Sequence, residues 1–257
     1  MKQLFYLGAL LFSLAASAEI PPPPEERIPL RNGDIVIDGK ADDPGWRNAA
    51  AIRLDRPPFG ETAQLRPAEL RLVWDGAFLY LLFSCSDADL LPAGEKRDDP
   101  LYAGDAVEIF LDGVGDGRQF YEIQLNPSGL VCDINHFFTG ETVKLDGNGL
   151  YTDWANVWDD PGFELAGLRV AASSDAAGYR VECAIPAAAP LRRLNRRKLA
   201  AGDRFRANFI RLDRRADGGT AVGCWSPTVP GRPHRSPGRM GTLILDPGNN
   251  QLSKEKP

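Results

Sequence analysis

The chain has few of the residues and motifs from which common catalytic sites are built. It holds two histidines, His136 and His234, and two methionines in 257 residues. It contains no G-x-S-x-G, H-E-x-x-H or phosphate-binding glycine loop, so these hydrolase, metalloprotease and nucleotide-binding signatures are absent. Enzymatic activity therefore has little support in the sequence, although no class of enzyme is excluded by motif alone.

Cysteine is also scarce, and the spacing of the cysteines argues against two kinds of cysteine site. The four cysteines include no C-x-x-C pair, which argues against a structural zinc site or a dithiol redox motif. Each lies in an apolar, strand-like run, so one or two disulfides and buried free thiols both remain open. They are Cys85, Cys132, Cys183 and Cys224.

Long apolar runs and excess positive charge are lacking too. No run reaches the roughly 20 apolar residues that span a bilayer, so no membrane span is expected. The formal net charge is -5. Mild acidity argues against nucleic acid as the main partner.

The N-terminus has the pattern of an export signal. Within residues 1–18, Lys2 precedes the apolar run LFYLGALLF, and the segment ends in Ala16-Ser17-Ala18. This pattern is typical of a secretory signal peptide and predicts a secreted or periplasmic protein.

The rest of the chain divides into three parts. Residues 19–32 contain PPPPEE and are expected to form an exposed, Pro-rich linker outside the core. Residues 33–246 have a length compatible with one all-β domain. Residues 247–257 are polar and are expected to form a flexible C-terminal tail.

Short strand-like runs dominate the central part, and turn residues separate them. The best helix candidate, PAAAPLRRLNRRK, is limited by its prolines to about two turns. Many short strands predict an antiparallel sandwich or barrel, and the pattern alone does not choose between them. The runs are 34–38, 68–74, 77–87, 105–126, 129–138, 165–173, 178–186, 204–214 and 241–246.

Residues 105–126, DAVEIFLDGVGDGRQFYEIQLN, are the most informative of these runs. They alternate as a β-hairpin does, with an apolar face and a face of acids, amides and aromatics. With the turn centred near Gly115, the register places Glu108 opposite Glu122 on the face turned away from the core. Because like charges directly opposite destabilise a sheet, the pair suggests metal binding, contact with sugar hydroxyls, or acid/base chemistry.

An acidic loop follows the run at 77–87. Carboxylate oxygens clustered on a loop suit calcium, which takes six to eight oxygen ligands, and a solvated charged loop is the alternative. The acids are Asp87, Asp89, Asp98, Asp99 and Asp105.

Several segments, in this order, resemble the family 9 carbohydrate-binding modules and their stand-alone secreted relatives. The matching segments are IVIDGKADDPGW, AELRLVWDGAFLYLLFSCSD, DDPLYAGDAVEIFLDGVGDGRQFYEIQLNPSG, GYRVECAIP, RANFIRLD, CWSPT and HRSPGRMGTLIL. The resemblance implies an antiparallel β-sandwich of the jelly-roll kind, sugar binding that is often at chain ends, and structural calcium.

The resemblance also implies site residues. In the family two aromatic side chains clamp a sugar ring and a glutamate of the VEIF segment binds its hydroxyls, which places the clamp at Tyr102 and His234 and the glutamate at Glu108. Tryptophan occupies both clamp positions in well-known members, so this chain departs from the pattern there. An arginine that binds ligand in some members is replaced by Glu122 or Gln124.

For the metal, the resemblance favours Asp87 and Asp99 as calcium ligands. The leading hypothesis is a secreted, non-catalytic carbohydrate-binding protein associated with polysaccharide catabolism, with polysaccharide or oligosaccharide as ligand and glycoside hydrolases as candidate partners. One alternative is a glycoside hydrolase that uses Glu108 and Glu122, held near the ~5 Å separation of retaining enzymes. A second is an electron-transfer sandwich that binds b-type haem, for which Met240 and His234 would be the ligands.

Overall fold

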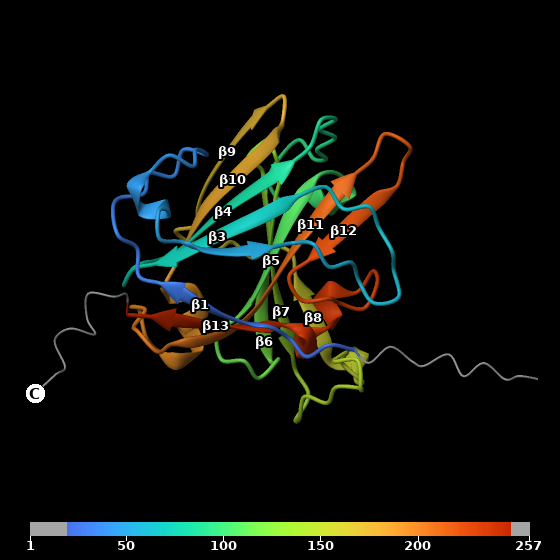
Figure 1. The fold of residues 1–257 in the computed structure, drawn as a ribbon. Coiled ribbons are helices and arrows are strands. Elements are labelled where there is room, and N and C mark those ends of the chain that lie inside the picture. The colour runs from blue at the N-terminus through green and yellow to red at the C-terminus, as the bar shows by residue number, and fades with distance from the viewer. Residues whose placement is uncertain (1–19, 248–257) are drawn as a thin grey trace, which may run out of the picture.

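Two β-sheets packed face to face make up the fold in the computed structural model, which describes residues 20–247 (Figure 1). The smaller sheet has the order β2-β3-β4-β10-β9, and the larger has the order β1-β13-β11-β5-β6-β7-β8, with β12 beside β11. The predicted antiparallel β-sandwich is confirmed, with one parallel pair, β1 and β13. The strands are β1 (Glu25–Pro29), β2 (Ala50–Arg53), β3 (Ala68–Trp74), β4 (Phe78–Ser86), β5 (Ala106–Asp112), β6 (Gln119–Leu125), β7 (Val131–Phe138), β8 (Val157–Asp160), β9 (Arg169–Asp175), β10 (Gly178–Pro186), β11 (Arg204–Arg214), β12 (Thr220–Cys224) and β13 (Gly241–Asp246).

The main core lies between the sheets and follows from the alternation of each strand. Leu70 and Leu72 of β3 face Val107 and Ile109 of β5 across one apolar cluster, and all four are at most 1% exposed. All four cysteines are buried free thiols, which settles the choice that their spacing left open. Burial of branched and aromatic side chains on both inner faces is the main source of stability in such a sandwich.

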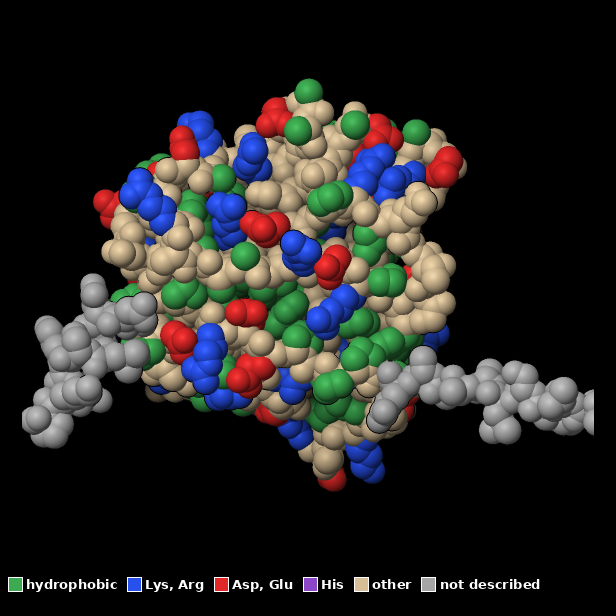
Figure 2. Space-filling model, in the orientation of Figure 1, with side chains coloured by type: hydrophobic (Ala, Val, Ile, Leu, Met, Phe, Trp, Pro, Cys, Tyr) green, Lys and Arg blue, Asp and Glu red, His purple; other side chains and the backbone are tan. Residues whose placement is uncertain are grey.

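Helix is scarce in the described part of the chain. The predicted two-turn helix is confirmed as α1 (Ala188–Leu191), continued by a 3-10 turn at Arg192–Leu194. Between residues 20 and 247, no helix is long and apolar enough to cross a membrane. On the face drawn in Figure 2, acidic and basic side chains are interspersed, as on an ordinary solvated surface.

The predicted hairpin forms, but its register differs from the expectation. Glu108 pairs with Gln124, and Phe110 pairs with Glu122, so the two glutamates share a face diagonally and are not directly opposite. The turn centres at Asp116 and not at Gly115, and the carboxylate of Asp112 holds its loop by accepting hydrogen bonds from the N–H groups of Val114, Gly115 and Gly117, at 3.0, 2.7 and 2.8 Å. Gly115 and Gly117 have positive φ, which glycine adopts without strain.

The outer face of the larger sheet is also covered. A second apolar cluster on this face combines strand residues with residues from the loops that fold over them, among them Phe110, Phe120, Tyr151 and Met240. Every residue of β5 is buried. The sequence places the acids and amides of the hairpin on the face turned away from the core. In the structure this face is covered, so these side chains are enclosed.

The expectation of an exposed linker over residues 19–32 is wrong for the described residues 20–32. Residues Glu25–Pro29 form β1, an edge strand parallel to β13, and Ile28 is fully buried in the main core. The prolines before it lack N–H groups but keep their carbonyls, and the Pro24 carbonyl accepts a hydrogen bond from the Thr242 N–H at 2.8 Å. The proposed leader, residues 1–18, and residues 248–257 of the proposed tail lie outside the described part of the chain.

The other strand predictions differ from the structure at one run that is not a strand and at three short strands. The run at 34–38 is irregular, and Val36 is 60% exposed. The Glu182 carboxylate accepts hydrogen bonds from the N–H groups of Asp38 and Gly39, at 2.8 and 2.9 Å. These bonds hold the end of the run in place of pairing with a strand. The short strands β2, β8 and β12 were not predicted, since four or five residues carry little periodic signal.

The role of β1 leads to a stability prediction. Ile28→Ala should lower the free energy of unfolding by about 3 kcal/mol, because it leaves a cavity under the edge of the sandwich. Val36→Ala, a similar truncation at an exposed position in the neighbouring segment, is the matched control and should change it little. Urea unfolding measures both, and equal small effects would contradict a structural role for β1.

Candidate ligand-binding site

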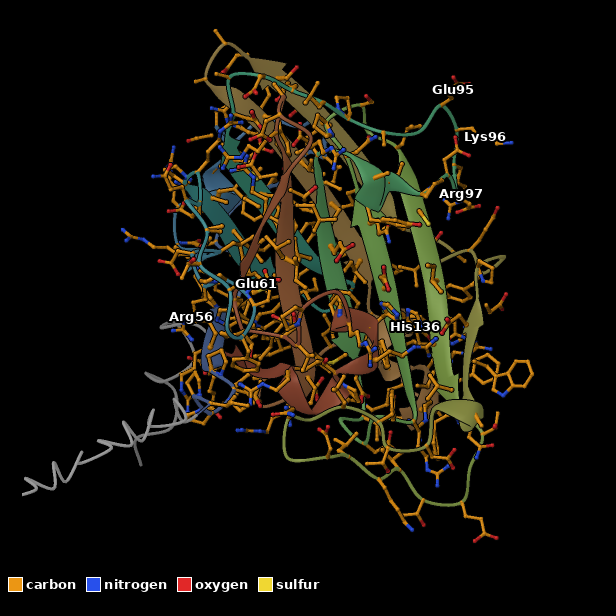
Figure 3. The ribbon with its side chains drawn as sticks, turned by 90° about the vertical axis from the view of Figure 1, so that its right-hand side faces the viewer. Arg56, Glu61, Glu95, Lys96, Arg97 and His136 are labelled. Atoms are coloured by element: carbon orange, nitrogen blue, oxygen red, sulfur yellow. The ribbon has the colours of Figure 1, made fainter. Side chains whose placement is uncertain are left out.

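A pocket of about 530 Å3 opens on the outer face of the larger sheet. Its floor is built by side chains from β5, β6, β7 and β11, and its walls by β8, β12 and three loops. Figure 3 shows two of its residues, His136 on the sheet and Glu61 on the loop after β2. The lining residues are Pro58, Glu61, Tyr102, Glu108, Glu122, Gln124, Ile134, His136, Asp159, Ile210, Leu212, Thr220, Val222, Thr228, Gly231, Pro233 and His234.

A row of acidic and basic side chains, alternating in charge, lies along one side of the pocket. His136 Nε2 lies 2.9 Å from Glu122 Oε2, and His136 Nδ1 lies 2.8 Å from Asp159 Oδ1. Arg235 Nη2 donates to the other Asp159 oxygen at 2.7 Å. Burial alone would lower the pKa of His136, but its hydrogen bonds to Asp159 and Glu122 outweigh burial and raise that pKa, so the imidazolium form is favoured.

The same contacts keep Glu122 ionised. Burial would raise the pKa of Glu122, but the hydrogen bond and charge of His136 and the hydrogen bond from Gln124 hold that pKa below its ordinary value. Gln124 Nε2 donates to Glu122 Oε1 at 2.6 Å, so each carboxylate oxygen has a protein partner. Glu122 is a fixed, satisfied negative charge in the pocket floor.

Glu108 is the opposite case. It is 4% exposed and lines the pocket, yet no hydrogen bond reaches its carboxyl from any described residue, and its Oε2 is fully buried. Burial, and then the charge of Glu122, raise the pKa of Glu108 well above the ordinary value for a glutamate. Beside an ionised Glu122, Glu108 therefore holds a proton over a wider pH range than usual.

Aromatic groups stand above this floor. Tyr102 lies in the 3-10 turn Leu101–Ala103, is 58% exposed, and its N–H donates to Gln124 Oε1 at 3.1 Å. His234 lies in the turn Pro233–Arg235, and its ring stacks on that of His136 with centroids 6.0 Å apart. Burial lowers the pKa of His234, so this ring is neutral at pH 7.

All five ligand residues predicted from the sequence line this one pocket. Tyr102, Glu108, Glu122, Gln124 and His234 come from three separate parts of the chain and converge because two loops fold onto the hairpin. Their role in binding stays a prediction, but their meeting place is a property of the fold.

Two residues of the charged floor were not predicted. His136 follows the alternation Cys132, Ile134, His136 along β7, and these residues pair with Gln124, Glu122 and Phe120 of the hairpin. That alternation was the available signal for His136. Asp159 pairs with His136 from a four-residue strand, which has no periodic signal of its own.

The predicted calcium ligands are separated in the structure. Asp87 is buried in a cluster with Asp105 and Asp213, whose carboxylate oxygens lie within 4.8 Å of one another. Arg66 forms ion pairs with Asp87 and Asp213, and Arg211 lies 3.1 Å from Asp87 and 3.5 Å from Asp213. Because guanidinium groups already neutralise these carboxylates, the cluster does not fit calcium while the arginines stay in place.

Asp99 lies apart from this cluster. Its carboxylate caps a turn by accepting the N–H groups of Glu95 and Lys96 at 2.8 and 3.2 Å. In Figure 3, Glu95 and Lys96 lie near the upper end of the molecule, above His136. Asp99 has a structural role in this turn and is not part of the carboxylate cluster around Asp87, and its role as a calcium ligand stays a prediction.

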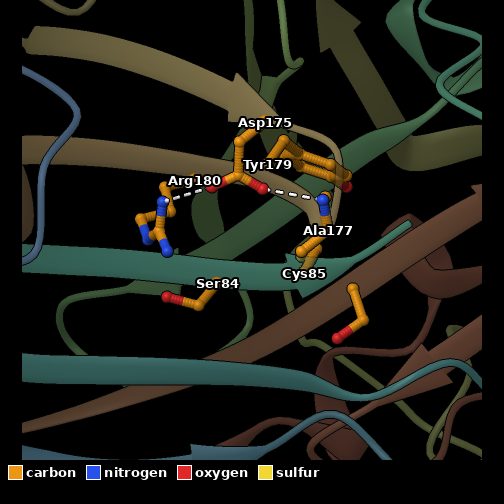
Figure 4. A pocket seen from close by; sticks show the side chains of 8 residues that line it. Ser84, Cys85, Asp175, Ala177, Tyr179 and Arg180 are labelled. Carbon is orange, nitrogen blue, oxygen red and sulfur yellow. Dashed lines mark hydrogen bonds and ion pairs between the residues drawn. The ribbon is translucent and has the colours of Figure 1, made fainter. Parts of the chain in front are cut away.

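A second, smaller pocket of about 130 Å3 lies at the turn between β9 and β10 (Figure 4). Asp175 accepts the Ala177 N–H at 2.8 Å and faces Arg180 at 3.4 Å, so its charged groups are paired locally. Burial raises the pKa of Cys85 to about 11, which keeps this thiol protonated and unreactive at neutral pH. The larger pocket is therefore the candidate site.

The fold and site together define a β-sandwich with a ligand-sized pocket in a loop-covered sheet face. A family model described as Carbohydrate family 9 binding domain-like matches residues 37–247, and the chain belongs to this family.

Two curated proteins are each 29% identical to this chain over 154 residues, 60% of its length. They are the exoglucanase XynX of Acetivibrio thermocellus and the endo-1,4-beta-xylanase A of Thermoanaerobacterium saccharolyticum. The match covers only 12% and 11% of these proteins. The similarity is thus confined to a small part of each enzyme.

Solved structures share the fold. A family 9 carbohydrate-binding module from Caldicellulosiruptor kristjanssonii in complex with cellotriose superposes with a TM-score of 0.61 at 21% identity, covering 90% of this chain and all of that one. A putative carbohydrate-binding protein from Bacteroides uniformis gives 0.66 at 16% identity, covering 87% of this chain and 99% of that one. The β-sandwich architecture is common to all three chains.

The state of Glu108 leads to a pH prediction. Because its pKa is raised in the folded protein, the folded form binds more protons than the unfolded form from about pH 4.3 up to that raised pKa, and stability falls as pH rises through this window. Glu108→Gln removes this loss, so its melting temperature should exceed that of the unmodified protein increasingly toward neutral and higher pH. Glu69→Gln, on the other sheet, is the matched control, and parallel melting curves for all three proteins would contradict a protonated Glu108.

The aspartate cluster leads to a metal prediction. We expect calcium and the chelator EGTA to give the same melting temperature, since Arg66 and Arg211 already neutralise Asp87 and Asp213. An ion present at a hundred times its Kd would add about 2.7 kcal/mol, which a thermal melt readily detects. Stabilisation by calcium that disappears in Asp105→Asn would overturn the expectation and assign the ion to this cluster.

Proposed function

We propose that this protein is a non-catalytic carbohydrate-binding module that holds a sugar unit in the pocket above β5 and β6. The observation that carries the proposal is a ligand-sized pocket whose floor presents the unpaired Glu108 carboxyl and whose rim carries Tyr102 and His234. Sugars offer hydroxyl donors for such a carboxyl and flat C–H faces for aromatic rings. Membership of a carbohydrate-binding family supports the same ligand class.

The walls fit this ligand as well. Apolar side chains flank the acids of the floor on both sides, because Ile210 of β11 pairs with Glu108 and Ile134 of β7 pairs with Glu122. Leu212 and Val222 add to the apolar lining. A volume of about 530 Å3 falls within the usual range of small-molecule sites. Such a site suits the end of an oligosaccharide chain better than a long, extended segment of polymer.

Hydrolysis is the second candidate, because one specific observation favours it. Glu108 with a raised pKa beside an ionised Glu122 resembles the acid and nucleophile of a glycosidase. However, His136 and Gln124 engage both Glu122 oxygens in hydrogen bonds, which makes this carboxylate a weaker nucleophile and base. The geometry therefore favours binding over bond cleavage.

We also propose that the protein is exported and acts alongside glycoside hydrolases that degrade polysaccharides. The leader-like residues 1–18 support export, and the similarity to a segment of two polysaccharide-degrading enzymes supports the association. Mass spectrometry of the mature protein tests the first part, since export requires a chain that begins near Glu19.

The rim leads to a binding prediction. Tyr102→Ala should weaken the affinity for the best-bound sugar about tenfold, because it removes one aromatic face from the ligand. Trp158→Ala is the matched control, since Trp158 is 57% exposed but does not line the pocket, and it should leave the affinity unchanged.

Calorimetric titration with neutral mono- and oligosaccharides measures these affinities. The unmodified protein should also release no reducing sugar from the polysaccharides it binds. Absence of binding across a broad glycan array would rule out the proposed function, and sustained sugar release that Glu108→Gln abolishes would favour the hydrolase.

A further inference from the structure

The unpaired carboxyl of Glu108 sets a requirement for the ligand. Glu108 is enclosed at 4% exposure and its Oε2 has no hydrogen-bond partner, while the neighbouring Gln124 amide donates to Glu122 and accepts from the Tyr102 N–H. A buried polar group without a partner is costly, so a ligand that brings a donor to this point recovers the missing interaction. A ligand in the pocket can supply that donor.

The charged residues around this point are of one sign, apart from one paired cation. Four acids line the pocket, namely Glu61, Glu108, Glu122 and Asp159, and no lysine or arginine of the described chain lines it. His136 is held between Glu122 and Asp159, so its charge is already matched on both sides. Glu122 and Asp159 are also compensated, by His136 and Arg235, whereas no ion pair is formed by Glu61 or Glu108 in the described chain, so the pocket favours a positive group beside Glu108 over a carboxylate.

A hydroxyl and an ammonium group meet this requirement differently. A hydroxyl donates one hydrogen bond and leaves the charge near Glu108 and Glu122 unchanged. An ammonium group has three donors and a positive charge, and hydrogen bonds between charged groups are roughly twice as strong as neutral ones. The enclosed position of the carboxyl increases the difference, because water screens it weakly.

We propose that the pocket selects a sugar unit that carries a protonated amino group, with the ammonium group bound by Glu108 and facing the charge of Glu122. The inference rests on the proposed function, since it names the class of sugar for that same site. The sugar ring would lie against the apolar wall of Ile210 and Leu212, below Tyr102 and His234. When the ammonium group binds, the proton held by Glu108 leaves to the solvent, so cation binding is coupled to proton release.

The first experiment compares matched sugars on the unmodified protein. Calorimetric titration at pH 6 with glucosamine, N-acetylglucosamine, glucose and glucuronate separates a positive, a neutral amide, a neutral hydroxyl and a negative ligand of nearly one shape. Glucosamine should bind about tenfold or more tightly than the two neutral sugars, and glucuronate most weakly. Repeating the glucosamine titration in buffers of different ionisation enthalpy should show proton release, and glucose should show none.

Two variants assign the preference to its residue. Glu108→Gln should bring the glucosamine to N-acetylglucosamine affinity ratio close to one, whereas Glu69→Gln, which removes an equal charge on the other sheet, should keep the ratio of the unmodified protein. Because the first experiment needs no variant, the proposal stays testable even if Glu108→Gln folds poorly.

The outcomes separate the two levels of the proposal. Neutral sugars that bind as tightly as glucosamine would overturn the amino-sugar inference and leave the proposed function standing. No binding of any sugar would overturn both. Methylammonium that binds as tightly as glucosamine would show a simple amine site, and would also overturn the inference.

Discussion

Burial of the β5-β6 hairpin on both faces is the constraint on which the rest of the structure depends. On the inner face, Val107, Ile109 and Ile123 complete the core between the sheets. On the outer face, loops close over Phe110 and Phe120 and form a second apolar layer. The loops bring Tyr102 and His234 over the hairpin, so the same packing that stabilises the larger sheet also creates the pocket.

Enclosing this face places acids where they need compensation, and the fold supplies it unevenly. The chain of contacts from Glu122 through His136 and Asp159 to Arg235 matches each charge with its opposite. Buried ion pairs of this kind contribute little net stability but become very costly when one partner is missing. Glu108 takes no part in this series of contacts. The pocket floor therefore contains one carboxyl group with hydrogen-bond partners, that of Glu122, and one without, that of Glu108. That asymmetry distinguishes a binding surface from a merely polar interior.

The sequence predicts the strands well where a periodic pattern is long, and less well elsewhere. Long runs stand out, whether they alternate because one face is buried, as β3 does, or are continuously apolar because both faces are buried, as in β4. β1 was mistaken for a linker, because its pairing with β13 depends on residues more than 200 positions away. The run at 34–38 has strand-like composition but is held by the Glu182 carboxylate, and no local pattern reveals such a contact.

Some residues of the candidate site can likewise be predicted from the sequence pattern, and others cannot. The apolar alternation of the hairpin places Glu108, Glu122 and Gln124 on the face away from the core. The observed partner of Glu108 is two residues from the expected one, and a shift of two residues keeps every side chain on its face. Tyr102 and His234 came from the family resemblance, since nothing local joins two turns so far apart in the chain. The cluster of Asp87, Asp105 and Asp213 needs three separate elements to meet, and the arginines that neutralise it are equally distant in sequence.

We expect the rim and the floor of the pocket to contribute differently to the affinity and the selectivity of binding. Under the proposed function, aromatic rings at the rim would contact the C–H faces that most sugars share, so we expect Tyr102 and His234 to add affinity with little discrimination. A buried carboxyl on rigid strands discriminates strongly, because any ligand that lacks the right donor leaves it unpaired. Glu108 is held by β5 between paired strands and cannot turn toward solvent, whereas Tyr102 stands on an exposed turn. We therefore expect ligand choice to depend on the floor of the pocket, and replacement of the rim residues to change affinity before it changes selectivity.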